Sequence, residues 1–498
     1  MVTSNGVRRA AALCGIAAMV IGCGGMKVVE GDPGGGESPN PDVGAGAAQS
    51  QPAEPGNAHS GSGGVSSAGA SSGAGSTKPG RALLPEPLRY SGKGFVVHEW
   101  GTDTVVVGSD GSLQRGLHHE EEDLPTFVYD RLKAGTMLGT EPSVTIKMET
   151  PVTYFYSDQP LSVTASVSFP KGVLTQWYPA VTRFTPGIAA PGALTLGAQP
   201  AYADPVLEPS FPFRSELCRE KFGTLRGGTL DWGKLEVLGR EQEAPELPEA
   251  PLEKFSWSYA RDVDSNALRA PSGEAERFLF YRGLGEFDLP VTVKASVGGE
   301  VTLSNAYSEA IPSVFMLNVD QTRGAYNEHA EGIAQGASLT DVAPSLEAAA
   351  SLDAYADDLG ARVTATLDAA GLFHDEARAM VNTWKRQWFR TPGVRLLYVI
   401  PQSWTDESIP LSISPKPEKT LRVMLIRVEL ITPEQEAADV AAIKLFDSAP
   451  QAAAAHFVAL GRFEEPRLRR ALALQASAAA SAYLATIQTA KSSIVSGE

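Results

Sequence analysis

Imidazole and carboxylate side chains gather in two short stretches of this chain. The first is the pair His98-Glu99, which lies inside an apolar run, and the second begins at His118-His119 and continues through four acidic residues. Glu149, in a third segment, could join them. Histidine nitrogens and carboxylate oxygens are the ligands that proteins offer to zinc, iron or manganese. The sequence therefore predicts a candidate divalent-metal or acid-base site made of His98, Glu99, His118, His119 and Glu149.

A purely structural interpretation of the same residues stays open. The chain contains no HExxH pair, and adjacent residues such as His98 and Glu99 point to opposite faces of a strand. The acidic run after His119 is typical of a solvated loop. His98 would share a strand face with Trp100, as a hydrogen-bonded core histidine does. The two interpretations make different predictions: a metal or acid-base site requires these side chains to lie close together in the fold, whereas a structural role does not.

Strands must position these residues. The apolar run 95–107 is followed by Gly108-Ser109-Asp110-Gly111, a turn signal that predicts a hairpin whose return strand brings His118 toward His98. The alternation of apolar and polar residues in 161–169 predicts a sheet with one buried face. We therefore expect residues 91–320 to form an antiparallel, sandwich-like β module. Its further strands are expected at 144–148, 152–156, 277–281, 291–297 and 314–319.

Helical patterns dominate the rest of the chain. In 375–389 the apolar residues fall on one helical face, and Thr432-Pro433-Glu434 is typical of a helix start, with a hydroxyl N-cap and proline in the first turn. We expect helices at 352–367, 375–389, 433–446, 451–460 and 465–489, with strands at 393–400 and 421–430. Residues 321–498 are thus predicted to form an α+β module with C-terminal helices, and the fold class is α+β.

The N-terminal segment indicates where the protein is sent. Arg8 and Arg9 precede an apolar run of about a dozen residues, whereas a membrane-spanning helix needs about 20. The run ends in Val20-Ile21-Gly22-Cys23, which resembles the lipobox of bacterial lipoprotein signal peptides. The resemblance implies that residues 1–22 are cleaved off and that Cys23 carries lipid, whereas a plain signal peptide is the alternative. Gly24 occupies the position where Asp would retain a lipoprotein at the inner membrane, which favours the outer membrane of the cell envelope.

Composition separates a tether from a folded body. Residues 31–80 consist mostly of Gly, Ser, Ala and Pro and contain no aromatic residue, so we expect residues 23–90 to be a disordered tether. Acidic and basic residues balance before Ser91, and the net charge of −16 therefore belongs to the folded part. That charge argues against a nucleic-acid partner. With Cys14 removed and Cys23 lipidated, Cys218 is the last cysteine, and no intrachain disulfide can form.

Three strings resemble those of a family of secreted or lipid-anchored bacterial proteins without an established activity. They are VHEWGT from Val97, KMETP from Lys147, and Thr383-Trp384 ahead of Trp388-Phe389. The resemblance covers most of residues 94–471, and this chain has Asp103 where the family has an aromatic residue. No catalytic residue can be carried over.

Two functional hypotheses follow from the sequence. The first is a non-enzymatic envelope lipoprotein, bound to the membrane through Cys23, whose body binds or scaffolds a partner and needs no cofactor. The alternative is a metal-dependent hydrolase that uses His98 and Glu99 with His118 or His119. The hydrolase needs these side chains within about 5 Å of one another in a concave pocket.

Overall fold

The computed structural model describes residues 88–117, 124–125, 127–130, 144–185, 187–190, 193–195, 227–242, 245–248 and 256–494. They belong to one compact unit, Arg81–Glu498. The predicted signal peptide and most of the tether lie outside the described residues, as do Cys23, Cys218, His118 and His119.

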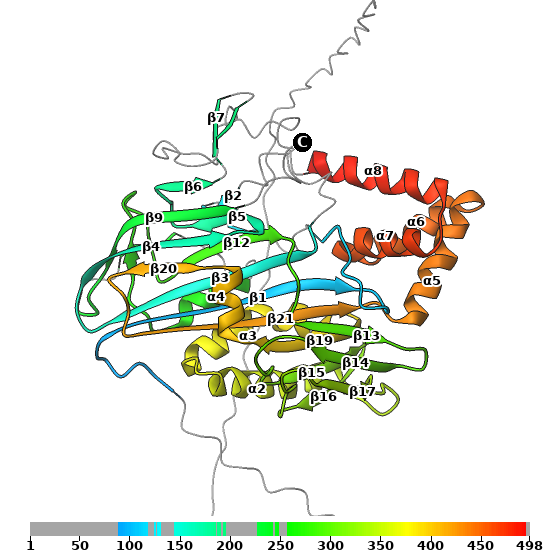
Figure 1. The fold of residues 1–498 in the computed structure, drawn as a ribbon, viewed down its shortest axis with the longest axis horizontal. Coiled ribbons are helices and arrows are strands. Elements are labelled where there is room, and N and C mark those ends of the chain that lie inside the picture. Colours follow the sequence, from blue (N-terminus) through cyan, green and yellow to red (C-terminus); the bar gives the residue numbers. More distant parts are fainter. Residues whose placement is uncertain are drawn as a thin grey trace, which may run out of the picture. The chain divides into compact units, whose positions relative to one another are not determined.

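A large mixed sheet forms the centre of this unit (Figure 1). Its two middle strands, β1 and β21, run parallel, and β3 pairs antiparallel with the other side of β1. Within the described residues it has ten strands, in the spatial order β18 (Ala350–Ser351), β16 (Arg323–His329), β15 (Val314–Val319), β19 (Gly393–Ile400), β21 (Lys419–Leu430), β1 (Phe95–Val107), β3 (Ile146–Ser157), β12 (Leu279–Gly285), β5 (Gly172–Tyr178) and β2 (Tyr129–Asp130).

Smaller sheets pack on one face of the central sheet. One apolar core draws its buried side chains from the central sheet and from both of these smaller sheets. The first consists of β11 (Ala275–Glu276), β10 (Leu268–Arg269), β9 (Gly228–Val237), β4 (Leu161–Phe169) and β20 (Leu411–Ser414), with β6 (Arg183–Thr185) paired to β9. The second consists of β13 (Val291–Ala295), β14 (Glu300–Asn305) and β17 (Ser338–Val342), and a separate pair joins β7 (Gly187–Ala190) to β8 (Ala193–Thr195).

Helices α2 (Leu352–Ala369) and α3 (His374–Arg390) cover the opposite face. Helix α3 is amphipathic, and Ala377, Met380, Trp384 and Trp388 on its inner side are all buried. Together with the 3₁₀ turn η1 (Ser256–Asp262), the two helices enclose a second apolar core. The body therefore has three layers: helices, the central sheet and the smaller sheets. A short helix, α4 (Gln402–Ser408), follows β19.

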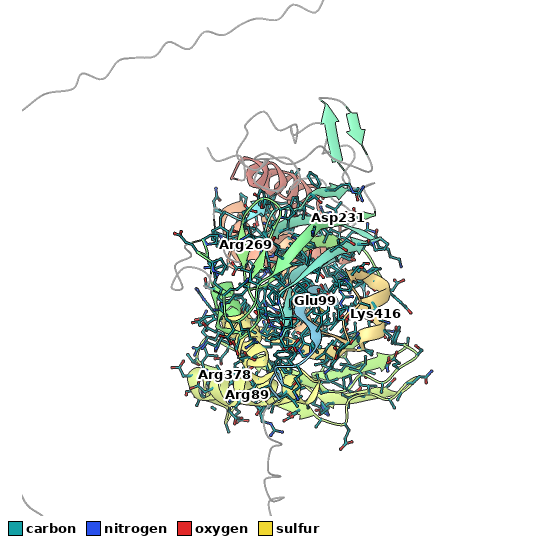
Figure 2. The ribbon with its side chains drawn as sticks, turned by 90° about the vertical axis from the view of Figure 1, so that its left-hand side faces the viewer. Arg89, Glu99, Asp231, Arg269, Arg378 and Lys416 are labelled. Atoms are coloured by element: carbon teal, nitrogen blue, oxygen red, sulfur yellow. The ribbon has the colours of Figure 1, made fainter. Side chains whose placement is uncertain are left out.

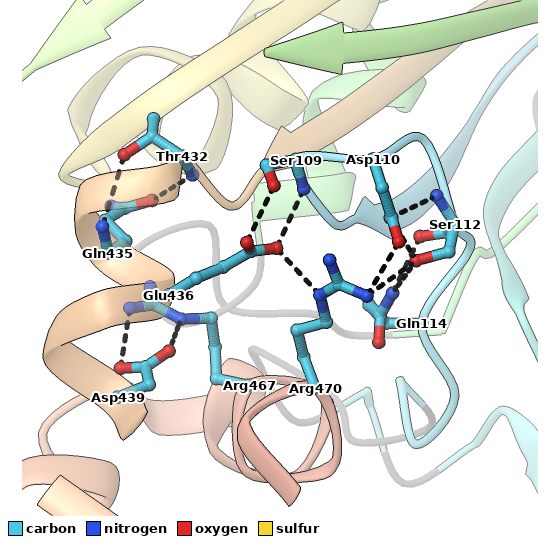
Figure 3. A network of polar contacts seen from close by, with 10 residues as sticks. All are labelled: Ser109, Asp110, Ser112, Gln114, Thr432, Gln435, Glu436, Asp439, Arg467 and Arg470. Carbon is cyan, nitrogen blue, oxygen red and sulfur yellow. Dashed lines mark hydrogen bonds and ion pairs between the residues drawn. The ribbon is translucent and has the colours of Figure 1, made fainter. Parts of the chain in front are cut away.

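The C-terminal helices have an apolar core of their own. They are α5 (Pro433–Lys444), η2 (Leu445–Asp447), α6 (Pro450–Val458), η3 (Gly461–Phe463), α7 (Glu464–Leu474) and α8 (Ala478–Ile494). Thr432 caps α5 in a reciprocal box with Gln435. Figure 3 shows how polar contacts join these helices to the turn after β1. Glu436 accepts hydrogen bonds from the Ser109 backbone N–H at 2.9 Å, from the Ser109 hydroxyl at 2.7 Å and from Arg470 at 2.7 Å.

The predicted α+β class is confirmed, and three local expectations are wrong. The strands expected at 144–148 and 152–156 are a single strand, β3, and the helix expected at 465–489 is divided into α7 and α8. The run 95–107 does not form a hairpin with a return strand, because β3 and β21 occupy both of its edges. The turn signal produces a tight turn that ends in an isolated bridge between Val107 and Leu113. The expected module boundary after residue 320 falls between β15 and β16, which pair with each other, so the two predicted modules share one sheet. In the described part of the chain, no helix combines the length and apolar character that a membrane crossing requires.

Candidate functional site

His98 lies on β1 and faces the helix layer. Its Nδ1 lies 2.9 Å from Oε2 of Glu376, and both side chains are fully buried. Glu376 also accepts hydrogen bonds from the Tyr156 hydroxyl at 2.6 Å and from the Phe373 backbone N–H at 2.7 Å. Burial and the Glu376 charge raise the pKa of Tyr156 well above its usual value, so this hydroxyl keeps its proton and donates. The contacts fix the start of α3 on the sheet, which is the role of a core histidine.

Glu99 points to the other face of β1, deep in the body (Figure 2). Its Oε1 accepts from Nε of Arg422 on β21 at 2.8 Å. Its Oε2 accepts from the Tyr281 hydroxyl at 2.8 Å and from the Thr153 hydroxyl at 2.7 Å. Although burial lowers the pKa of Arg422, the nearby Glu99 and Tyr281 raise it above its usual value, so Arg422 stays protonated. Glu99 is therefore the centre of a buried polar cluster that joins four strands of the central sheet, β1, β3, β12 and β21.

Glu149 interrupts the register between β1 and β3. Thr150 and Met148 are paired with consecutive residues of β1, which leaves Glu149 as a bulge. Arg462 in η3 binds its carboxylate, and Nε of Arg282 donates to its backbone oxygen at 2.5 Å. Burial opposes ionisation, but Arg462, Lys147 and Arg282 outweigh it and hold the pKa of Glu149 at about 2. This carboxylate ties the central sheet to the C-terminal helices.

The described residues do not provide the donor set of a metal site. His98 and Glu99 occupy opposite faces of one strand, and Arg462 engages Glu149. In the part of the chain that the structure describes, no group of three or more His, Cys, Asp or Glu side chains is arranged to hold a metal ion. His118 and His119 lie outside that part. The structure thus separates the three predicted residues that it describes, each into a different internal contact.

Close packing explains the rest of the string around His98. A Cβ on Gly101 would lie 1.9 Å from the Thr150 backbone oxygen, so only glycine fits between the strands there. The Thr102 hydroxyl donates to the Leu425 oxygen at 2.8 Å across the parallel pair. In the second string, the Thr150 hydroxyl accepts from the Trp384 indole at 3.1 Å, which connects β3 to α3. Both strings are therefore sites where the layers join.

Asp103 is a buried acid that the sequence analysis did not single out as a site. Its side chain is inaccessible to solvent, and neither carboxylate oxygen has a hydrogen-bond partner among the described residues. Burial and the charge of Glu149 raise the pKa of Asp103 to about 8, against the opposing effect of Arg422. An acid within the apolar run 95–107 was the available signal. At neutral pH this group is mostly an uncharged carboxylic acid in the core.

A cavity of about 420 Å³ lies between α2, the loop before β15 and residues of three central strands, β16, β19 and β21. Residues Ser313, Glu328, Arg362, Ala365, Val399 and Leu421 are among those that line it. Glu328 and Arg362 form an ion pair, with Arg362 Nε 2.7 Å from Glu328 Oε2. Of the predicted site residues that the structure describes, none lines this cavity. It is large enough for a small organic ligand, and it is the candidate functional site.

Comparison of the chain with models of known protein families and with curated proteins finds no match. Any functional assignment must therefore come from the residues themselves.

Proposed function

We propose that this protein is a lipid-anchored binding protein of the bacterial cell envelope. In this proposal a lipid on Cys23 holds the mature chain at the outer membrane, and residues 23–90 act as the tether. The folded body binds a ligand or partner and carries out no reaction. The support for anchoring is the Val20-Ile21-Gly22-Cys23 string after a short apolar run.

The cavity beside α2 carries the binding part of the proposal. It combines an apolar wall with a small number of polar groups, which is the usual composition of a ligand site. His98, Glu99 and Glu149, the described residues best suited to acid-base or metal chemistry, are held in internal contacts instead. The arrangement favours binding over the alternative of a metal-dependent hydrolase.

Membrane fractionation tests the anchor. The wild-type protein is expected in the outer-membrane fraction and to incorporate labelled palmitate, because acyl chains on one cysteine give durable attachment. A Cys23→Ser variant is expected to lose both the label and the membrane association, whereas Cys14→Ser should change neither. Equal membrane association of wild type and Cys23→Ser would refute lipid anchoring at this residue.

Elemental analysis tests the binding role against the hydrolase. The purified full chain is expected to contain no stoichiometric zinc, iron or manganese, and a His98→Ala/His118→Ala double variant is expected to match it. A metal present at about one per chain and lost in the double variant would overturn the proposal. It would establish the hydrolase alternative as the one to pursue, with His119 as a further candidate ligand.

A further inference from the structure

The wall of the α2 cavity is made by small aliphatic side chains. Ala365 and Ala369 lie one helical turn apart on α2, and both line the cavity. Across from them Val399, Leu421 and Val423 come from the strand ends. No aromatic residue is among the described residues that line this cavity. Its volume of about 420 Å³ is nearly three times the roughly 150 Å³ of a cavity that binds benzene, so it fits the aliphatic part of a ligand.

A buried hydroxyl without a partner marks the polar end of the site. Ser313 is 6% exposed, lines the cavity, and its Oγ has no hydrogen-bond partner among the described residues. A buried polar atom without a partner is costly, so a ligand that offers a hydrogen bond to Ser313 removes this cost. The hydroxyl can both donate and accept, and a ligand hydroxyl, ester or amide would serve.

The charged side chains that line the cavity are all paired: Arg362 with Glu328, and Arg422 with Glu99 and Asp406. Arg362 and Glu328 both line it, and they bind each other with a shortest nitrogen–oxygen distance of 2.6 Å. Glu328 is also the first cause of the raised pKa of Arg362, which keeps the guanidinium protonated. A ligand carboxylate would therefore have to compete with Glu328 for Arg362, and an ammonium group would have to compete with Arg362 for Glu328. An uncharged head group meets neither penalty.

We infer that the α2 cavity binds a neutral aliphatic amphiphile, with its chain against the alanine face of α2 and its uncharged head group hydrogen-bonded to Ser313. The inference rests on the binding role proposed above and names the ligand class of that site. The ligand contacts come from α2 and from the loop before β15, and the ion pair between Arg362 and Glu328 holds α2 against β16, the strand that pairs with β15.

Calorimetric titration of the full chain, in the detergent-free Cys23→Ser form, tests the inference with two matched probes, octan-1-ol and octanoate. Octan-1-ol is expected to bind at least tenfold more tightly than octanoate. Ser313→Ala should lower the affinity for octan-1-ol about fivefold, which corresponds to the loss of one hydrogen bond of about 1 kcal/mol. It should not lower the melting temperature. Ala365→Leu should place a larger side chain in the path of the aliphatic chain and weaken octan-1-ol binding, again in a folded protein. Ala354→Leu, on the exposed side of the same helix, is the control and should bind as the parent does.

The outcomes separate the ligand class from the binding role. Octanoate binding as tightly as octan-1-ol, or Ser313→Ala and Ala365→Leu leaving the affinity unchanged, would overturn the inference. Absence of binding by a folded parent protein would also overturn it. None of these outcomes bears on lipid anchoring or on metal content, because membrane fractionation and elemental analysis measure those two properties independently.

Discussion

Replacement of Asp103 by Asn should make the protein progressively more stable than the wild type as the pH rises. Asp103 is fully buried without a hydrogen-bond partner among the described residues, and its pKa is raised from 3.8 to about 8. A raised pKa means that the folded protein keeps a proton that the unfolded chain releases. The stability from this group is therefore complete below about pH 4 and is lost as the pH rises toward 8. Asparagine has a similar shape and no such titration.

The size of the effect follows from the slope of this linkage. One proton held by the folded state alone changes the free energy of unfolding by about 1.4 kcal/mol per pH unit. Between pH 5 and pH 7, the stability of Asp103→Asn relative to wild type should therefore rise by about 3 kcal/mol. The prediction concerns how the stability difference between the variant and the wild type changes with pH. The amide itself changes the free energy of unfolding by the same amount at every pH.

Urea unfolding followed by tryptophan fluorescence at a series of pH values measures this difference. Asp357→Asn, on the exposed side of α2, serves as the matched control and should follow the wild type. The charged groups that act on Asp103 are Glu149, Arg422 and Glu99. A stability difference that stays constant within about 0.5 kcal/mol from pH 5 to pH 7 would refute the claim that the folded protein holds Asp103 uncharged.

Three further substitutions test close contacts between elements, and a fourth, Gly360→Ala, serves as a comparison. Glu376→Ala leaves the buried imidazole, tyrosine hydroxyl and backbone N–H without their acceptor, and calorimetry should show a loss of stability of roughly 3–9 kcal/mol, at about 1–3 kcal/mol per orphaned group. Gly101→Ala should lower the free energy of unfolding by at least about 3 kcal/mol, because the new Cβ collides with backbone. Gly360→Ala lies within α2, where the nearest contacts of a Cβ are at 3.7 Å, and should raise the free energy of unfolding by about 0.5–1 kcal/mol. Glu436→Ala should speed hydrogen exchange in the C-terminal helices while the central sheet stays protected.

Matched surface variants control these tests. Arg378→Ala lies on the exposed side of α3 (Figure 2), and Asp447→Ala lies on the exposed side of the C-terminal helices. Both are expected to change stability by less than about 0.5 kcal/mol. A Glu376→Ala loss no larger than that of Arg378→Ala would contradict the buried cluster around His98. Equal exchange rates in Glu436→Ala and wild type would contradict the docking role of Glu436.

Local pattern identified many of the elements. The limits of β4, β15 and β19 follow from apolar runs of the right length, and α2 and α3 follow from their helical periodicity. The pairing of the strands could not be predicted in the same way. The parallel neighbour of β1 comes from residues 419–430, and nothing in a turn or periodicity refers to a strand so far away.

The candidate residues were identified by type, whereas their partners were not. Glu376 resembles an ordinary acid in the first turn of a helix, yet it binds His98 from 278 positions away. One signal was available for Glu99 and Arg422. Each is a charge within a strongly apolar strand, and a buried charge requires an opposite one. Matching such charges between strands would have suggested the pair, and would have weakened the case for Glu99 as a metal ligand.

The parallel pairing of β1 with β21 makes completion of the chain a condition for folding. Glu99 and Arg422, which join these strands, are 323 positions apart, and closing a loop of that length costs about 5 kcal/mol in chain entropy. The middle of the sheet cannot assemble until residues 419–430 have been made. Until then, the part of the sheet that ends at β19 and the part that begins at β1 have no strand to join them. A copy that is cut short before β21 lacks the strand between β19 and β1, so its central sheet stays in two separate parts.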